Sequence, residues 1–439
     1  MTALAWPVVV AEIGWLAMGI VDTIMVAPLG PAAIGAVGAG SILFMALMMP
    51  GFGTLLALDT FVARSFGAGR IDECHRWLFA GVQLAIVMTV VLTVVAFLGV
   101  RALPAVGFHP DVIAALSPYM TSLLWSVAPL MLYIAMRRYL QAMNVVRPIM
   151  AGLIIANAIN LGANWLLVEG RLGFPALGVV GAAYATVVSR VFLGVFTFVV
   201  LLRRERDTPS GLHDVPFAID VARVWAILKV GLPAAGQILL EVGVFATASA
   251  LAGKIAPAAV AAHQIVLNIA GFVFMFPYGI SSAAAVRVGQ AMGRHDAHGV
   301  RLAGWGALGL ATSVMMISAA LFALTPRPFM RLFTDDVSVV EAGAAVLLIA
   351  AVFQLFDGVQ TVTTGALRGL GETRMPMYSN LIGHWMIGLP TGYVLCFRLG
   401  WGIEGLWMGL ALGLILVGSV LLGVWSHKSR AAVVPVKGL

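Results

Sequence analysis

The sequence predicts an all-α integral membrane protein with twelve transmembrane helices in two six-helix bundles. Of its 439 residues, 61% are hydrophobic and only 10% are charged. A soluble surface needs far more charge than that. Apolar runs of membrane-spanning length recur along the whole chain, and the second half of the chain repeats features of the first. These observations exclude a soluble globular domain.

Twelve runs reach the length of about 20 mostly apolar residues that a membrane-spanning helix needs. Charged residues and Gly/Pro clusters separate them. The predicted spans are 4–27, 33–60, 76–100, 112–140, 147–168, 178–202, 224–252, 258–285, 300–324, 338–366, 376–397 and 402–426.

The distribution of Lys and Arg predicts the orientation of these spans. With the N-terminus in the cytoplasm, 19 basic residues fall on the cytoplasmic side and 6 on the other, while Arg190 lies inside a predicted helix. This bias is the positive-inside pattern, and it places both termini in the cytoplasm. The net charge of +7 is therefore a topology signal. We expect contact with the lipid bilayer and none with nucleic acid.

An internal repeat predicts two homologous halves. Pro7 is matched by Pro233, and LGPAAIGA at 29–36 resembles IAPAAVAA at 255–262. GAGR, VVRPIM and RLGFPALGVVG also have later counterparts, in the same order and with offsets of 224–228 residues.

The repeat sets the predicted domain organisation. We expect an N-terminal bundle at 1–202, a cytoplasmic linker at 203–223, a C-terminal bundle at 224–426 and a cytoplasmic tail at 427–439. Because six is even, both halves enter the membrane in the same direction. They are then related by a pseudo-two-fold axis along the membrane normal, with substrate bound between them.

Five acidic residues lie within predicted spans, where an ionisable group costs at least about 2.5–3.5 kcal/mol and usually faces a cavity or a partner. They are Glu12, Asp22, Asp59, Glu241 and Asp357. Asp59 is near a helix end, where we expect it to pair with Arg64 as a structural contact.

Asp22 is the main candidate in the first half. It follows Pro7, which weakens the helix around it and makes bending possible. In the fifth predicted helix, Asn157, Asn160 and Asn164 share one face. Thr186 adds a hydroxyl in the sixth. Amide groups of this kind bind cations through oxygen and carboxylates through NH2.

Glu241 and Asp357 are the candidates in the second half. Gln237 stands one turn before Glu241, and Gln354 about one turn before Asp357. The repeat places Ala248 opposite Asp22, so the acids are not duplicated with the fold. We therefore expect the halves to have different roles. The alternative for all these polar groups is structural hydrogen bonding between helices.

Motifs of other protein classes are missing from the sequence. It has no phosphate-binding loop, dinucleotide fingerprint, HExxH pattern or Ser/His/Asp arrangement. Cys74 and Cys396 form no recognisable metal or disulfide framework. We expect no enzyme activity and no cofactor.

The segments DTIMVAPLGPAAIGAVG at 22–38 and ALRGLGETRMP at 366–376 resemble the multidrug and toxic compound extrusion (MATE) family, in its NorM-type and eukaryotic-like branch. The resemblance runs from about Trp6 to Trp425. It implies a secondary active antiporter that exports cationic drugs or dyes by alternating access, in exchange for H+ or Na+.

The resemblance also assigns candidate residues. The coupling ion is expected at Asp22, Asn160, Asn164, Thr186, Glu241 and Asp357, and Pro7 matches the bending proline. The substrate cavity is expected to include Asp22, Gln237, Glu241, Phe353 and Asp357. A Na+ ion would bind at Asp22 with Asn160 and Asn164, or at Glu241 with Asp357. Phe353 stands where NorM-type members often have Tyr, which disfavours a sodium site there.

Two other functions stay open. One is a flippase for lipid-linked precursors within the same superfamily, and the other is a membrane-embedded enzyme or sensor. The acidic character of the buried charges favours cationic cargo. We expect a monomer in the bacterial inner membrane.

Overall fold

The computed structural model describes residues 2–106, 109–207 and 210–431. The packing of Cα atoms divides the chain into two compact units. One is Val10–Gly231, called here the N-terminal unit, and the other joins Met1–Val9 to Leu232–Leu439, called the C-terminal unit. The predicted bundle boundaries at 202 and 224 remain predictions, and the first nine residues group with the C-terminal unit.

The first half of the chain is helical from end to end. Its elements are α1 (Thr2–Val26), η1 (Ala27–Leu29), α2 (Pro31–Leu55), α3 (Ala57–Gly67), α4 (Ile71–Ala102), η2 (Leu103–Val106), α5 (Pro110–Leu123), η3 (Leu124–Ser126), α6 (Val127–Ala142), α7 (Arg147–Leu167) and α8 (Val179–Asp207).

Within the N-terminal unit, α8 packs against α5, α6 and α7. A tight turn leads from α1 into α2. Gly30 adopts φ +104° there, which favours glycine because it has no Cβ. Pro31 then occupies the first turn of α2, where its missing N–H costs nothing.

The second half has the same all-helical character. Its elements are α9 (Val221–Ala252), α10 (Pro257–Gly293), α11 (Ala297–Leu324), α12 (Pro326–Arg331), α13 (Val337–Gly369), α14 (Arg374–Asn380), η4 (Leu381–Gly388), α15 (Leu389–Tyr393), η5 (Val394–Arg398) and α16 (Gly402–Ala431).

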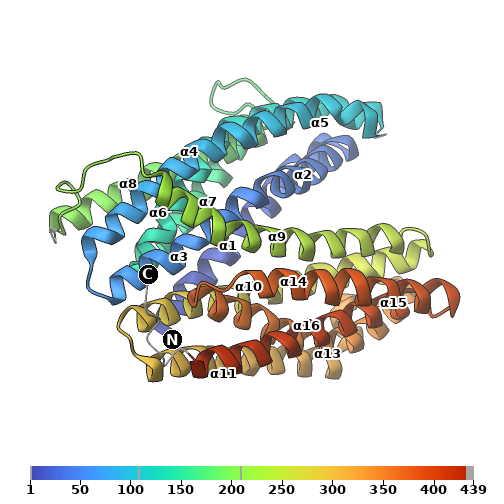
Figure 1. The fold of residues 1–439 in the computed structure, drawn as a ribbon. Coiled ribbons are helices and arrows are strands. Elements are labelled where there is room, and N and C mark those ends of the chain that lie inside the picture. Colours follow the sequence, from blue (N-terminus) through green and yellow to red (C-terminus); the bar gives the residue numbers. More distant parts are fainter. Residues whose placement is uncertain (1, 107–108, 208–209, 432–439) are drawn as a thin grey trace. The chain divides into compact units, whose positions relative to one another are not determined.

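Helix α13 is central to the C-terminal unit, because α10, α11 and α16 all pack against it. Figure 1 shows α11, α13 and α16 side by side within this unit. Most residues in the second half of α13 are buried. Polar groups on this helix are therefore placed inside the bundle.

The duplication predicted from sequence is visible in the helix lengths. The spans Pro31–Gly67 and Pro257–Gly293 both have 37 residues, and Pro110–Ala142 and Val337–Gly369 both have 33. One difference has a clear cause. The span Pro110–Ala142 is interrupted by η3 just before Pro129. The matching helix α13 contains no proline and runs without interruption.

The all-α membrane fold is confirmed. Among the described residues, eleven helices are long and apolar enough to cross a membrane. The twelfth predicted span, 376–397, is helical throughout but divides into α14, η4, α15 and η5, of which η4 and η5 are π-helical.

Glycine packing accompanies this irregular span. A Cβ on Gly409 of α16 would lie 2.3 Å from the Gly392 Cα, and one on Gly388 would lie 3.0 Å from the Gly409 carbonyl oxygen. The two backbones therefore approach as closely as small residues in membrane helices allow.

The segment between α8 and α9 is attached to α4 rather than extended. Gln83 donates to the Ala218 carbonyl at 2.6 Å and accepts from the Asp220 amide at 3.2 Å. The Arg223 guanidinium binds both carboxylate oxygens of Glu73 at 3.0–3.1 Å. The predicted linker thus packs on the N-terminal unit.

Candidate functional site

The structure separates the five acids of the predicted spans by whether they form an ion pair with a cationic side chain. Glu12, on α1, forms an ion pair with Arg137 of α6. Asp59, in the first turn of α3, binds Arg138 with 3.3 Å between Oδ2 and Nη1. Successive residues on a helix point about 100° apart, so two adjacent arginines reach two different helices. The expected contact between Asp59 and Arg64 remains a prediction.

Arg137 and Arg138 lie at the end of the predicted span 112–140 and are two of the 19 basic residues assigned to the cytoplasmic side. They are only 6% and 4% exposed. They neutralise buried carboxylates, and the side of the membrane on which they lie stays a prediction. Glu12 and Asp59 are thereby structural ion pairs, which sequence alone left undecided.

Asp22 has a different environment. Its Oδ1 accepts hydrogen bonds from Asn160 Nδ2 at 3.0 Å and Asn164 Nδ2 at 2.7 Å. Its Oδ2 accepts one from the Thr186 hydroxyl at 2.5 Å. The residue is 3% exposed. Among the described residues, no Lys, Arg or His forms an ion pair with it.

Helix register brings these donors together. Asn160 and Asn164 stand one turn apart on α7, and Thr186 lies on α8, which packs against α7. The expected contact between Asp22 and the asparagine face is therefore present. Asn157, on the same predicted face, instead donates to the Gly14 carbonyl at 2.9 Å and to that of Leu153 at 2.9 Å.

The site also offers oxygen ligands. The side-chain oxygens of Asn160 and Asn164 are buried and have no hydrogen-bond partner among the described residues. The residues around Asp22 therefore carry hard oxygen donors, of which the Thr186 hydroxyl is in contact with the carboxylate and the two amide oxygens belong to side chains whose nitrogens contact it. Such a set fits a proton on Asp22 or a small cation beside it.

Arg190 is a residue whose environment sequence reasoning did not anticipate. It lies one turn after Thr186 on α8 and is 7% exposed. Its guanidinium donates to Ser126 Oγ at 2.6 Å and lies over the rings of Phe44 and Trp15, at 4.7 and 5.7 Å. Aromatic faces stabilise a desolvated cation in this way. The feature of the sequence that could have indicated this site is the position of Arg190, a single basic residue inside an apolar run.

The C-terminal unit holds two further acids without a cationic partner among the described residues. Gln237 Nε2 donates to Glu241 Oε2 at 2.6 Å, one turn away on α9. Asp357, on α13, is 5% exposed. Gln354, three residues earlier, is fully buried, and neither atom of its amide has a described partner.

Phe353 lies in an aromatic cluster of the same unit. Its ring centroid is 6.0 Å from that of Phe245 and 5.6 Å from that of Trp407. It is 3% exposed. Its contacts are therefore those of a core residue.

Pro7 lies inside α1 and is grouped with the C-terminal unit, whereas Asp22, on the same helix, belongs to the N-terminal unit. Pro233 has the equivalent position inside α9. Any bend of α1 near Pro7 would thus occur where the chain passes from one unit to the other.

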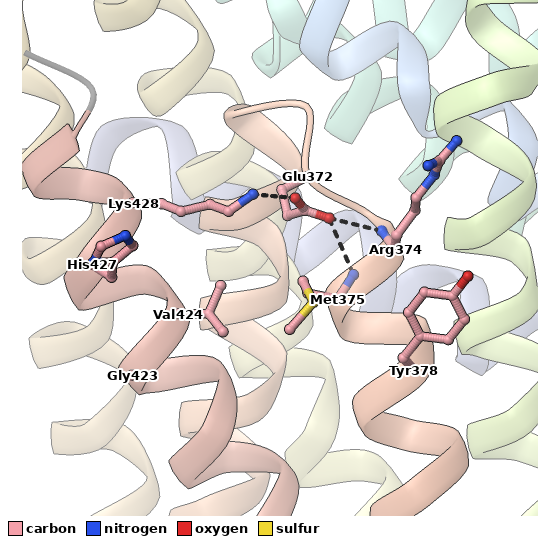
Figure 2. Close-up of a pocket in the computed structure, with 8 residues that line it drawn as sticks. All are labelled: Glu372, Arg374, Met375, Tyr378, Gly423, Val424, His427 and Lys428. Carbon is pink, nitrogen blue, oxygen red and sulfur yellow. Dashed lines mark hydrogen bonds and ion pairs between the residues drawn. The ribbon is translucent and has the colours of Figure 1, made fainter. Parts of the chain in front are cut away.

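A cavity of about 570 Å³ opens in the C-terminal unit. Figure 2 shows its lining, in which Glu372 binds Lys428 and accepts from the backbone amides of Arg374 and Met375, each at 3.1 Å. Glu372 thereby caps α14. Gly371 adopts φ +77° just before it, which favours glycine. None of the predicted site residues lines this cavity.

The fold and the two groups of unpaired acids define a duplicated helical membrane protein with ionisable groups at membrane depth, which is the character of a secondary transporter. Comparison with known proteins agrees. The MatE family model matches residues 7–166 and 233–394, one copy in each half.

Two relatives match over nearly the whole chain. The chain is 34% identical to a probable multidrug resistance protein NorM of Mesorhizobium japonicum, over 98% of this chain and 94% of the relative. It is 33% identical to a protein of the same description from Brucella suis, over 98% and 93%. The crystal structure of the eukaryotic MATE transporter AtDTX14 matches with a TM-score of 0.86 and 20% identity, covering 98% of this chain and 97% of that one.

The chain therefore belongs to the MATE family of membrane transporters.

Proposed function

We propose that this transporter exports cationic amphipathic compounds in exchange for H+, with Asp22 and the Glu241/Asp357 pair as the two coupling stations. The observation that carries the proposal is a division among the five acids of the predicted spans. Glu12 and Asp59 form ion pairs with arginines, whereas Asp22, Glu241 and Asp357 form none among the described residues. An unpaired carboxylate at membrane depth is retained at a cost, and it usually serves ion or substrate movement.

Competition for these carboxylates gives the exchange mechanism. A coupling ion that neutralises an acid removes the charge that attracts a cationic drug, so the two ligands favour different states. In the outward-facing state the acids take up the ion and release the drug. In the inward-facing state the ion leaves and the anionic site accepts a new drug. A ligand shifts such an equilibrium only by its differential affinity for the two states.

We favour H+ over Na+ as the coupling ion. All three described partners of Asp22 donate to its carboxylate, which stabilises the charged form, so a state in which these donors withdraw would favour uptake of a proton. Phe353 also supplies no hydroxyl near Asp357. Sodium at the Asp22 oxygen set or at the Glu241/Asp357 pair is the alternative.

Drug export is supported by the relatives, which are described as probable multidrug resistance proteins. A lipid-linked precursor carries a pyrophosphate and would need a cationic cavity. Arg190 is an intramembrane cation that interacts electrostatically with Asp22 and forms no ion pair among the described residues, and three carboxylates outnumber it. Cationic cargo is therefore the better match. We place the protein in the inner membrane as a monomer with cytoplasmic termini.

Ethidium accumulation in cells tests the proposal. Cells that express the protein should retain less dye than cells without it. Asp22→Asn and Glu241→Gln should restore accumulation at equal protein abundance, and Asn157→Ala should not. Unchanged accumulation on expression of the wild-type protein would contradict drug export.

A further inference from the structure

A polar stripe runs along one face of α13 from the middle of the helix to its C-terminal end. Its members occupy positions i−3, i, i+4, i+7 and i+11 around Asp357, which is the spacing of one helix face. They are Gln354, Asp357, Thr361, Thr364 and Arg368. All are buried, with exposed fractions of 0–8%.

The hydroxyls of this stripe depart from the usual behaviour of threonine in a helix. Thr89, Thr197 and Thr247 of this chain each donate to the carbonyl four residues earlier, at 2.7–2.8 Å. By contrast, Thr361 Oγ1 and Thr364 Oγ1 have no hydrogen-bond partner among the described residues.

The Gln354 amide, on the other side of Asp357 along the helix, also lacks hydrogen-bond partners: neither its nitrogen nor its oxygen has one among the described residues. Each buried polar group left unpaired costs about 1–3 kcal/mol. Ordered water is the usual partner of such groups in proteins.

The neighbouring helices pack on the flanks of the stripe. A Cβ on Gly365 would meet Ser281 of α10, and one on Gly358 would meet Met315 of α11. On the other flank, a Cβ on Gly418 of α16 would meet backbone atoms of Phe356 and Gln360. The face with Asp357, Thr361 and Thr364 lies between these contacts.

Few titratable groups act on this face. The Glu241 carboxylate of α9 interacts electrostatically with Asp357. His384 of η4 bonds to the Gln360 side chain at 3.3 Å, and Arg368 ends the stripe. Within the described part of α10, α11 and α16, these contacts bring no other charged side chain to the stripe.

We propose that the stripe holds a file of ordered water through which Asp357 exchanges protons with the cytoplasm. Thr361 and Thr364 lie about 6 and 10 Å beyond Asp357 along the helix axis, so one water between successive groups bridges each interval. Arg368, about 16 Å beyond Asp357, marks the end of the file and relays no proton, because a guanidinium has no acceptor. The positive-inside pattern places the Arg368 end at the cytoplasm.

The proton transfer is a relay of O–H bonds. Protonated Asp357 gives its proton to the first water and becomes a carboxylate. Each water or hydroxyl then accepts one proton and passes one on, so that a single proton reaches the cytoplasm. The identity of the ion rests on the proposed function, whereas the presence of water in the stripe does not.

Cysteine accessibility tests the water file without using transport. In a Cys74→Ala, Cys396→Ala background, the single variants Thr361→Cys, Thr364→Cys and Thr363→Cys are treated with 2-aminoethyl methanethiosulfonate in vesicles. The protein is then unfolded and its remaining thiols are counted with a maleimide dye.

Thr363 is the matched control. It is the same residue type on the same helix, fully buried and also without a described partner. Because it lies about 120° from Asp357 around the axis, a water bound to its hydroxyl would not belong to a file that is continuous with Asp357. We expect the thiols at 361 and 364 to react several-fold faster than the thiol at 363. Equal rates at 364 and 363 would overturn the proposal.

Transport measurements test the relay itself. The double variant Thr361→Val, Thr364→Val should slow pH-driven ethidium uptake several-fold while ethidium binding is unchanged. Thr361→Ser, Thr364→Ser should keep the wild-type rate, and so should Thr363→Val. A wild-type rate in the double valine variant would refute the relay. If wild-type protein shows no pH-driven uptake, the proposed function fails, and the labelling experiment still decides the water file.

Discussion

Asn164 Nδ2 lies 2.7 Å from Asp22 Oδ1, and this contact joins α7 to α1 within the N-terminal unit. Asn160 and Thr186 complete the environment of the same carboxylate. The hydrogen bonds to this buried acid all come from neutral donors, and Arg190 acts on it electrostatically without an ion pair among the described residues. This environment is the basis on which we propose Asp22 as a coupling residue.

Of the three asparagines of α7, we expect Asn160 and Asn164 to be needed for coupling and Asn157 to be needed only for stability. Asn160→Ala or Asn164→Ala should reduce coupled efflux strongly, because each removes a donor to Asp22. Asn157→Ala removes contacts to backbone carbonyls only and should leave the coupling intact at some cost in stability. Efflux at matched abundance, with a thermal unfolding assay beside it, measures both. Equal losses of coupling in all three variants would argue against the assignment.

The ion pair between Glu12 and Arg137 should behave as a structural unit. Arg137→Met alone leaves a buried carboxylate unpaired, and breaking a buried pair in this way costs about 3–5 kcal/mol. The double variant Glu12→Gln, Arg137→Met should recover most of that loss. Unfolding can be followed with a thiol-reactive dye, because Cys74 and Cys396 are both buried. A double variant no more stable than the single one would contradict the pairing.

Close packing at Gly409 should be sensitive to a single methyl group. Gly409→Ala places a Cβ 2.3 Å from the Gly392 Cα, so α16 and the π-helical span must separate. The melting temperature should fall. Gly423→Ala on the same helix meets nothing within 4 Å and is the matched control. A smaller loss for Gly409→Ala than for the control would show that the span relaxes easily.

The loss of stability on acidification should depend in part on Glu372. Burial raises the pKa of this carboxyl, but hydrogen bonds from Lys428 and from the Met375 and Arg374 amides outweigh it, so the pKa lies below its ordinary value of 4.5. A depressed pKa stabilises the fold above the unfolded value, and this stabilisation is lost as the pH falls through the folded value.

Melting temperatures of wild type and Glu372→Gln should therefore differ most above pH 4.5 and converge below it. Lys428→Gln should behave similarly, and Arg430→Gln, a neighbour that does not line the cavity, should resemble wild type. A gap between wild type and Glu372→Gln that widens on acidification would contradict this account.

Sequence predicted the architecture well, because the membrane imposes it. Twenty-residue apolar runs, basic loops and the offset repeat are strong local signals, and each predicted span overlaps a helix. The π-helical form of 381–388 could not be predicted, since it accompanies backbone contact with glycines far along the chain. The break at η3 has a local cause in Pro129, so it could have been predicted from the sequence.

The site was predicted in part for a similar reason. An acid in an apolar run is visible in sequence, and so are amides spaced by one turn. Which acid has a cationic partner depends on packing between distant helices, so the ion pairs of Arg137 and Arg138 could not be predicted from the sequence. The missing partners of Thr361 and Thr364 are likewise a property of the folded helix.

The central claim is that Asp22 and the Glu241/Asp357 pair exchange a proton for a cationic drug. The most direct measurement is ethidium transport by purified protein in vesicles, driven separately by a pH gradient and by a Na+ gradient. We predict transport under the pH gradient and its loss in Asp22→Asn and in Glu241→Gln. Full antiport by both variants would contradict the claim, and transport driven only by Na+ would reassign the ion.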